Sequence, residues 1–232
     1  MILQEYRLLE NEEQKANLSR FFKTGRGQYG EGDLFLGVKV PQTRLLVKKY
    51  HEKVSLPDLR QLITSPYHEV RLFALLALVQ KFIRSKNEDE KREFVDFYLS
   101  HTRYINNWDL VDLSCYEILG NWLLDKDRGI LYRLAESKNL WEQRIAMVSC
   151  MQFVRHSQFD DCLAMAEILR NHPHDLIQKA VGWLLREVGK RDEERLKDFL
   201  SEYYKTMPRT ELRYAIEKFP LEIRQKYLNG EI

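Results

Sequence analysis

Apolar residues recur every three or four positions along most of the chain after residue 40. This spacing is typical of amphipathic helices, and no stretch shows the apolar–polar alternation of a strand. Short breaks divide the helical stretches at Pro57, Ser65-Pro66, Asn87, Asn106-Asn107, Pro173, Pro208 and Pro220. Ser65-Pro66 matches a helix N-cap followed by proline at the first helical position. The pattern therefore predicts an all-α chain.

A glycine-rich segment, Gly25 to Gly37, interrupts the helical pattern near the start of the chain. We expect it to form a loop between the first helix and the helix entered at Pro41. It lacks the Lys-Ser/Thr ending of a phosphate-binding P-loop, and it follows a helix rather than a strand. A nucleotide cofactor is therefore not predicted.

A basic residue recurs near the start of several apolar helices, as Arg71, Arg144, Lys179 and Arg213. The last two intervals are about 35 residues, and the first is about twice as long, with Trp108 in the empty position. Repeats of this length that hold two helices form stacked arrays. We therefore predict an α-solenoid of about six antiparallel, HEAT-like helix pairs, in a single domain over residues 1–232.

Stacking of such repeats would align the recurring basic residues along one concave, locally basic face. The chain as a whole has a net charge of only +2, so composition neither requires nor excludes a nucleic-acid partner. The alternative is that each basic side chain pairs with a nearby acid at the surface of its helix.

Composition indicates a well-folded globular protein, with 44% hydrophobic and 31% charged residues. No apolar run is long enough to cross a membrane, and the first residues lack the pattern of a signal peptide. Cys115, Cys150 and Cys162 are widely spaced in apolar surroundings. They are therefore predicted to be reduced core thiols of a cytoplasmic protein.

The segment from Asp175 to Arg195 predicts an amphipathic helix with an unusual outer face. Its buried stripe consists of Ile177, Val181, Leu184, Leu185 and Val188. The opposite side carries Lys179, Trp183, Arg186 and Lys190. Three basic side chains can meet phosphates while an indole meets a base or sugar. The alternative interpretation is that Trp183 packs against a neighbouring helix.

The segment from Tyr104 to Leu113 predicts a short helix capped by Asn106 or Asn107. Trp108 and Asp112 are four residues apart and share a helix face. The helix is apolar nearly all round, so we expect Asp112 to be partly enclosed and to need a partner. That partner could be Arg144, in a purely structural ion pair. Asp109 is a less well aligned candidate.

No metal-binding set is predicted, because His172-Pro173-His174 offers no third ligand.

Four segments together resemble one known family. They are Phe35-Leu36-Gly37-Val38-Lys39-Val40-Pro41, Trp108 with Asp112, Trp141 with Arg144, and Gly182-Trp183-Leu184-Leu185-Arg186-Glu187. In this order and spacing they are similar to the AlkD-type DNA alkylation repair proteins, the HEAT-like-repeat DNA glycosylases. The resemblance extends over roughly residues 20–200. Each segment alone is weakly specific, and their common register is fairly specific.

The resemblance implies excision of positively charged N-alkylated purines, such as 3-methyladenine and 7-methylguanine, from duplex DNA by hydrolysis of the N-glycosidic bond. It implies that Asp112 is the catalytic carboxylate and that Trp108 and Trp183 face the deoxyribose of the lesion. It also implies that Arg144 holds the DNA backbone and that Tyr29 supplies an aromatic contact from the early loop.

Further DNA contacts are expected from the basic face, at Arg71, Lys179, Arg186 and Lys190. No cofactor is expected. The expected partner is duplex DNA with alkylated bases, and no membrane. The chain is expected to act as a monomer, in the cytoplasm and on the nucleoid when bound to DNA.

Two other functions fit the same residues. A DNA-binding repeat protein without catalysis would use the basic face and would need Asp112 only as a partner for Arg144. A protein-interaction scaffold, a common use of helical solenoids, would use Trp183 as an interface anchor. Salt-sensitive DNA binding without base release favours the first, and weak, salt-insensitive binding favours the second.

Overall fold

The computed structural model describes residues 1–232, and its regular structure is helical throughout. The predicted all-α class is therefore confirmed. The only strand-like feature is an isolated bridge between Leu34 and Tyr67. The chain divides into two compact units, Met1–Ser114 and Cys115–Ile232, and each unit is described by itself. The prediction of one continuous domain stays a prediction.

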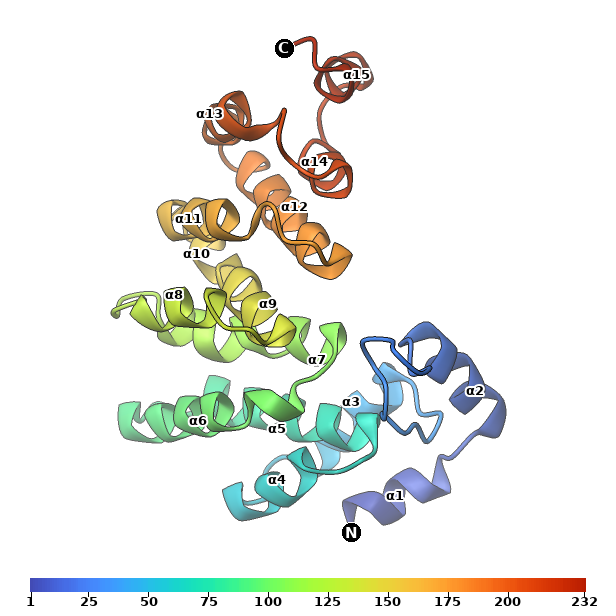
Figure 1. The fold of residues 1–232 in the computed structure, drawn as a ribbon. Coiled ribbons are helices and arrows are strands. Elements are labelled where there is room, and N and C mark those ends of the chain that lie inside the picture. Colours follow the sequence, from blue (N-terminus) through green and yellow to red (C-terminus); the bar gives the residue numbers. More distant parts are fainter. The chain divides into compact units, whose positions relative to one another are not determined.

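The first unit is built around one long helix, α5. Its elements are α1 (Ile2–Leu8), α2 (Glu12–Phe21), α3 (Val40–Tyr50), α4 (Leu56–Ile63), α5 (His68–Arg84), α6 (Glu88–Ser100), a 3₁₀ turn η1 (Thr102–Tyr104) and α7 (Trp108–Asp112). Helix α5 packs against α1, α3, α4, α6 and α7 (Figure 1). Thirteen of its seventeen residues are buried, as expected of a helix enclosed on nearly all sides. The other helices of this unit are therefore positioned from α5.

The predicted glycine-rich loop is present between α2 and α3. The carboxylate of Glu69, on the first turn of α5, accepts hydrogen bonds from the backbone N–H groups of Leu36, Gly37 and Val38 at 2.9–3.1 Å. The Glu69 side chain is buried. A buried carboxylate needs such donors, because burial without partners costs several kcal/mol. Glu69 therefore ties the end of the loop to the central helix.

Gly37 is required where this loop passes α2. Its φ is +81°, a conformation that favours glycine. A Cβ at this position would also lie 2.1 Å from the carbonyl oxygen of Asn11. The loop therefore approaches the N-terminal end of α2 more closely than any side chain would allow.

The predicted start of a helix at Ser65-Pro66 is wrong, because α5 begins at His68. Backbone groups of Pro66 and His68 form hydrogen bonds with the early loop instead. Leu34 donates its N–H to the carbonyl of Pro66 and accepts a hydrogen bond from the N–H of His68. Ser65 accepts a hydrogen bond from the N–H of Tyr67. Because the Pro66 carbonyl binds Leu34 of the loop, it does not accept a helical hydrogen bond, and the helix begins at His68.

The second unit is likewise built around one long helix, α12. Its elements are a π-helical turn η2 (Tyr116–Gly120), α8 (Gly129–Ala135), α9 (Leu140–Ser149), α10 (Met151–Arg155), α11 (Asp160–Leu169), α12 (Asp175–Gly189), α13 (Glu193–Tyr203), α14 (Arg209–Ala215) and α15 (Leu221–Asn229). Helix α12 packs against α9, α10, α11, α13 and α14 (Figure 1). Its predicted buried stripe is confirmed, since all five apolar residues have no exposed surface.

Helices α12 and α14 touch at Gly182. A Cβ on this residue would lie 2.4 Å from the carbonyl oxygen of Glu211 and 2.6 Å from Cβ of Tyr214. The glycine therefore lets the backbones of α12 and α14 approach each other directly beside Trp183.

Glu211 lies in this contact with no exposed surface. Neither of its carboxylate oxygens has a hydrogen-bond partner. Burial raises the pKa of Glu211 to about 9, and the positive charge of Arg170 offsets only part of this effect. The side chain is therefore a neutral acid at pH 7.

The three cysteines are buried and free, which confirms their prediction as core thiols. No helix is long and apolar enough to span a membrane.

Glu69→Gln is expected to lower the free energy of unfolding by about 2–3 kcal/mol. Oε1 accepts all three N–H groups and Oε2 accepts the N–H of Leu36 as well, so an amide would lose the charge that strengthens these bonds and would turn an NH2 group towards the N–H of Leu36. Chemical denaturation measures this loss, and hydrogen exchange should show reduced protection of the Leu36, Gly37 and Val38 amides. Glu93→Gln, at an exposed position of α6, is the control. Equal stability of the two variants would contradict the proposed role of Glu69.

Glu211→Gln is expected to flatten the dependence of stability on pH. The folded chain keeps the Glu211 proton up to about pH 9, whereas the unfolded chain loses it near the ordinary value of 4.5. Stability from this group is thus fully present below pH 4.5 and falls as pH rises towards 9, by up to about 1.4 kcal/mol per pH unit. Thermal unfolding from pH 4 to 9 measures the slope. Glu222→Gln, exposed on α15, should keep the native slope, and parallel curves for all three proteins would refute the assignment.

Candidate active site

The short helix α7 carries two of the predicted site residues. The Asn107 side chain accepts a hydrogen bond from the N–H of Trp108 at 2.9 Å, which confirms the predicted cap at one of its two candidate positions. Trp108 and Asp112 are the first and last residues of α7, so they lie one turn apart on one face. Both side chains are half-buried, as predicted for Asp112.

Trp108 and Asp112 both line a cavity of about 480 Å³ within the first unit. Its walls come from α2, the early loop, the start of α3, α5 and α7. The lining residues are Gln14, Leu18, Phe21, Phe22, Phe35, Val38, Lys39, Val40, Pro41, His68, Glu69, Leu72, Trp108, Asp109, Asp112 and Leu113. Most of these side chains are apolar or aromatic. A carboxylate at such a wall acts in a lower dielectric than it would on an open surface.

An aromatic cluster surrounds Trp108. The ring of Phe22 stacks against its indole at 5.4 Å between centroids, and Phe21 meets it edge-on at 5.8 Å. Phe22 is buried, whereas Phe21 is 60% exposed although it is a large apolar residue. The indole is therefore held on one side by packed aromatic rings.

His68 joins two parts of the unit beside this cluster. Its Nε2 lies 2.9 Å from Oδ2 of Asp109 on α7, and its Nδ1 lies 3.2 Å from Oδ2 of Asp33 in the loop. The imidazole packs against the rings of Phe22 and Phe35, with centroids 4.8 and 4.7 Å away, and these two rings stack on each other at 5.3 Å. Both carboxylates accept hydrogen bonds, so both ring nitrogens must donate.

The charges around His68 favour its protonated form. Burial alone would lower the pKa of His68, but the charge of Asp109 and the hydrogen bonds to Asp109 and Asp33 outweigh it and raise the pKa to about 9. Burial would likewise raise the pKa of Asp33, but the hydrogen bond from His68 and the charge of Arg71 hold it below its ordinary value. The cluster therefore contains an imidazolium between two carboxylates.

Arg71, a predicted DNA contact, is buried in the same cluster. Its guanidinium lies 2.7 Å from Oδ1 of Asp33. It also donates hydrogen bonds to the Ser65 carbonyl and the Asn106 side chain. A contact between Arg71 and a phosphate would require this ion pair to open, and that contact stays a prediction.

Two further predicted contacts are partly or fully enclosed. Tyr29 is half-buried in the early loop. Arg144, on α9 in the second unit, is 5% exposed and donates a hydrogen bond to the carbonyl of Leu176 on α12. Arg144 thus connects two helices of its own unit.

The outer face of α12 carries the predicted basic stripe, and its cations are paired with acids. Trp183 is half-buried. Lys179 lies 2.7 Å from Asp175, Lys190 lies 2.6 Å from Glu187, and Arg186 pairs with Glu217 of the neighbouring segment. These are partly exposed ion pairs, which contribute about 0–1 kcal/mol each. Each of these cations is therefore already neutralised by a carboxylate of its own unit.

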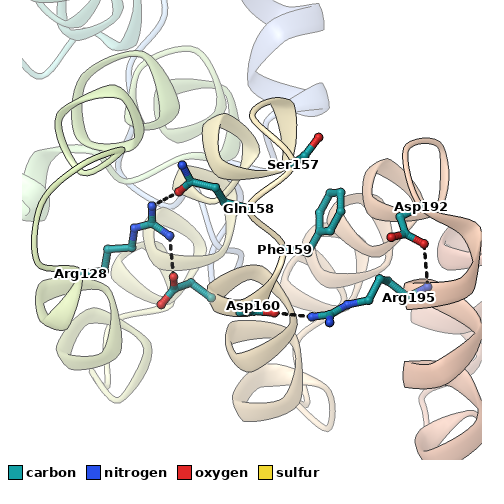
Figure 2. Close-up of a pocket in the computed structure, with 8 residues that line it drawn as sticks. Arg128, Ser157, Gln158, Phe159, Asp160, Asp192 and Arg195 are labelled. Atoms are coloured by element: carbon teal, nitrogen blue, oxygen red, sulfur yellow. Dashed lines mark hydrogen bonds and ion pairs between the residues drawn. The ribbon is translucent and has the colours of Figure 1, made fainter.

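A second cavity, of about 560 Å³, lies in the second unit near the start of α11. Figure 2 shows Arg128 bound to Gln158, and Arg195 reaching Asp160. Arg128 also pairs with Asp161 at 2.6 Å and lies over the ring of Phe153. The arginines here already bind groups of their own unit, so this cavity is a weaker candidate for chemistry than the one beside Trp108.

The sequence did not point to Asp33, His68 or Phe22 as site residues. His68 and Asp109 are 41 residues apart, and no local spacing connects them. The only available signals were the adjacent aromatic pair Phe21-Phe22 before the glycine-rich loop and the position of Asp109 next to Trp108.

Comparison with known proteins identifies the family. The model of the DNA alkylation repair enzyme family matches residues 2–219. Among solved structures, a predicted DNA alkylation repair enzyme from Enterococcus faecalis is similar, with a TM-score of 0.70 and 20% identity, covering 91% of this chain and 97% of that one. At this identity the likeness shows a shared fold. No curated protein matches the chain. Because the family model spans nearly the whole chain, the protein belongs to the DNA alkylation repair enzyme family.

Proposed function

We propose that this protein is a DNA glycosylase that removes positively charged N-alkylated purines, such as 3-methyladenine and 7-methylguanine, from duplex DNA. The observation that carries the proposal is the position of Trp108 and Asp112. They lie on one face of α7, half-buried, at an apolar and aromatic cavity. Membership of a DNA alkylation repair family supports DNA as the substrate.

The chemistry suits a carboxylate in these surroundings. An N-alkylated purine cation is already a good leaving group. When the C1′–N bond breaks, its electron pair goes to the base, which leaves neutral, and the sugar gains oxocarbenium character. Asp112 would stabilise that charge and accept a proton from the water that adds to C1′. The apolar wall strengthens its effect on the developing charge.

The aromatic residues would select for the cationic lesion. The faces of indole rings attract positive charge by roughly 0.5–2 kcal/mol each, depending on desolvation. In this proposal Trp108 faces the deoxyribose of the lesion, and the part of Trp183 stays the one that the family resemblance implies. A neutral base does not gain this attraction, so unmodified DNA would be spared both by weaker binding and by its poorer leaving group.

The finer fold prediction belongs to the same proposal. We propose that the helices are HEAT-like pairs whose concave face binds the duplex. The packing of α4 on α5 in the first unit, and of α8 on α9 and α11 on α12 in the second, supports this arrangement. Lys179, Arg186 and Lys190 would bind phosphates, with Arg144 and Tyr29 as further DNA contacts.

Asp112→Asn is expected to lower the single-turnover rate of methylpurine release by roughly 100-fold or more, because the amide cannot stabilise the charged sugar or accept a proton. Release of 3-methyladenine and 7-methylguanine from methylated duplex DNA measures the rate. Affinity for the same DNA should remain near that of the native protein. Asp96→Asn, at an exposed position of α6, is the matched control. A native release rate in Asp112→Asn would refute the assignment of the carboxylate.

Neutralising the stripe is expected to weaken DNA binding without changing the chemistry. Lys179→Ala and Lys190→Ala should each reduce the slope of log affinity against log salt by about 0.9, the value for one phosphate contact. Titrations of duplex DNA at several salt concentrations measure this slope. Lys197→Ala is the control, because Lys197 is also an ion-paired lysine of the second unit, on α13. If all three variants keep the slope of the native protein, Lys179 and Lys190 do not contact phosphates and the stripe is not part of the DNA interface.

The same measurements separate the two rival functions. Tight, salt-sensitive binding by a folded protein that releases no base indicates a non-catalytic DNA-binding protein. Weak binding that does not respond to salt indicates a protein-interaction scaffold.

A further inference from the structure

Helix α7 depends on tertiary contacts for its position. It contains only five residues, and isolated helices of this length are not stable in water. The positions of Trp108 and Asp112 are therefore set by the groups that hold α7 to the rest of the first unit.

Asp109 supplies one of those contacts from the middle of α7. Its side chain is buried, its Oδ2 accepts the hydrogen bond from His68, and its Oδ1 has no hydrogen-bond partner. The Nε2–H of His68 is thus the donor that compensates the burial of this carboxylate. Removing it would leave a buried carboxylate on α7 without a hydrogen bond.

The charges in this cluster balance only when His68 is protonated. The groups that face it are Asp109 from α7, Asp33 from the loop and Arg71 from α5. The two negative charges of Asp109 and Asp33 are then balanced by the positive charges of Arg71 and His68. A neutral imidazole can donate from only one nitrogen, so either α7 or the loop would lose its bond to the ring.

The imidazole is also coupled to Trp108 through packing. The ring of Phe22 contacts both side chains, with centroids 4.8 Å from the His68 ring and 5.4 Å from the indole. Phe35 covers the imidazole as well, at 4.7 Å and 22° between the rings. A shift of the imidazole therefore changes the packing of the indole as well as the hydrogen bond to α7.

We propose that His68 is a positioning residue, which holds α7 through Asp109 so that Trp108 and Asp112 keep the geometry needed at the candidate site. It touches neither the DNA nor the reacting atoms in this proposal. The inference rests on the proposed function for its catalytic consequence, whereas its structural part can be measured without DNA. Loss of the His68 proton would remove the positive charge that faces Asp109, weaken the bond that holds α7 and reduce base excision at high pH.

The first test uses the native protein without DNA. Nitrogen NMR of the His68 ring should show both nitrogens protonated at pH 7.5 and a titration near pH 9. The indole N–H resonance of Trp108, assigned by its loss in Trp108→Phe, should shift over the same pH range. A His68 ring that titrates near 6.5, or a Trp108 resonance that does not follow His68, would overturn the proposal even if no variant of His68 folds.

The second test uses His68→Gln, which keeps an N–H donor but removes the charge. The Trp108 resonance should lose its shift near pH 9, and the single-turnover excision rate at pH 7.5 should fall by roughly tenfold with unchanged DNA affinity. In the native protein, the excision rate should fall as pH rises through 9. His51→Gln, at the other buried histidine of this unit, should behave like the native protein.

The outcomes distinguish the two proposals. If the native protein releases no base while the NMR shifts occur as described, the glycosylase proposal fails, but the role of His68 in holding α7 stands. If the native protein releases base and His68→Gln does so at the native rate and with the native pH profile, the glycosylase stands and His68 has no positioning role.

Discussion

The first turn of α5 buries three charged side chains, which together bind the loop between α2 and α3 and the short helix α7. Glu69 accepts the backbone N–H groups of the loop, Arg71 binds Asp33, and His68 joins Asp33 to Asp109. A buried charge that loses its partner costs about 3–5 kcal/mol. The loop and α7 therefore cannot leave α5 independently. These buried ion pairs and hydrogen bonds hold the loop and α7, which form two walls of the cavity beside Trp108.

The parts of this arrangement that depend on local spacing could be predicted from the sequence. The buried stripe of α12 follows from helical periodicity, and the cap at Asn107 and the common face of Trp108 and Asp112 follow from positions a few residues apart. The bond between His68 and Asp109 could not be predicted, because it depends on how α5 and α7 pack. The start of α5 was misplaced for the same reason, since the loop takes the backbone groups at Pro66 and His68.

The recurring basic residues show a second limit of local patterns. Arg71 and Arg144 occur near helix starts like Lys179, and the repeat suggested that all of them share one exposed face. Arg71 and Arg144 are buried, whereas Lys179 is partly exposed. A spacing fixes the helix face on which a residue lies, but burial depends on the segment that covers that face. Arg71, between the apolar residues Val70 and Leu72, forms an internal ion pair with Asp33 that its position near a helix start did not predict.

Pairing of the exposed cations with acids also bears on how the protein would find damaged DNA. When a phosphate displaces Asp175, Glu187 or Glu217 from its cation, that acid remains close to the DNA and repels it. Each phosphate contact therefore contributes less than an isolated lysine would, in keeping with the net charge of +2. Under the proposed function, such a surface would bind ordinary duplex DNA weakly. Discrimination then depends on groups that respond to the lesion itself, and a carboxylate and an indole at an apolar cavity respond most strongly to a base that carries positive charge.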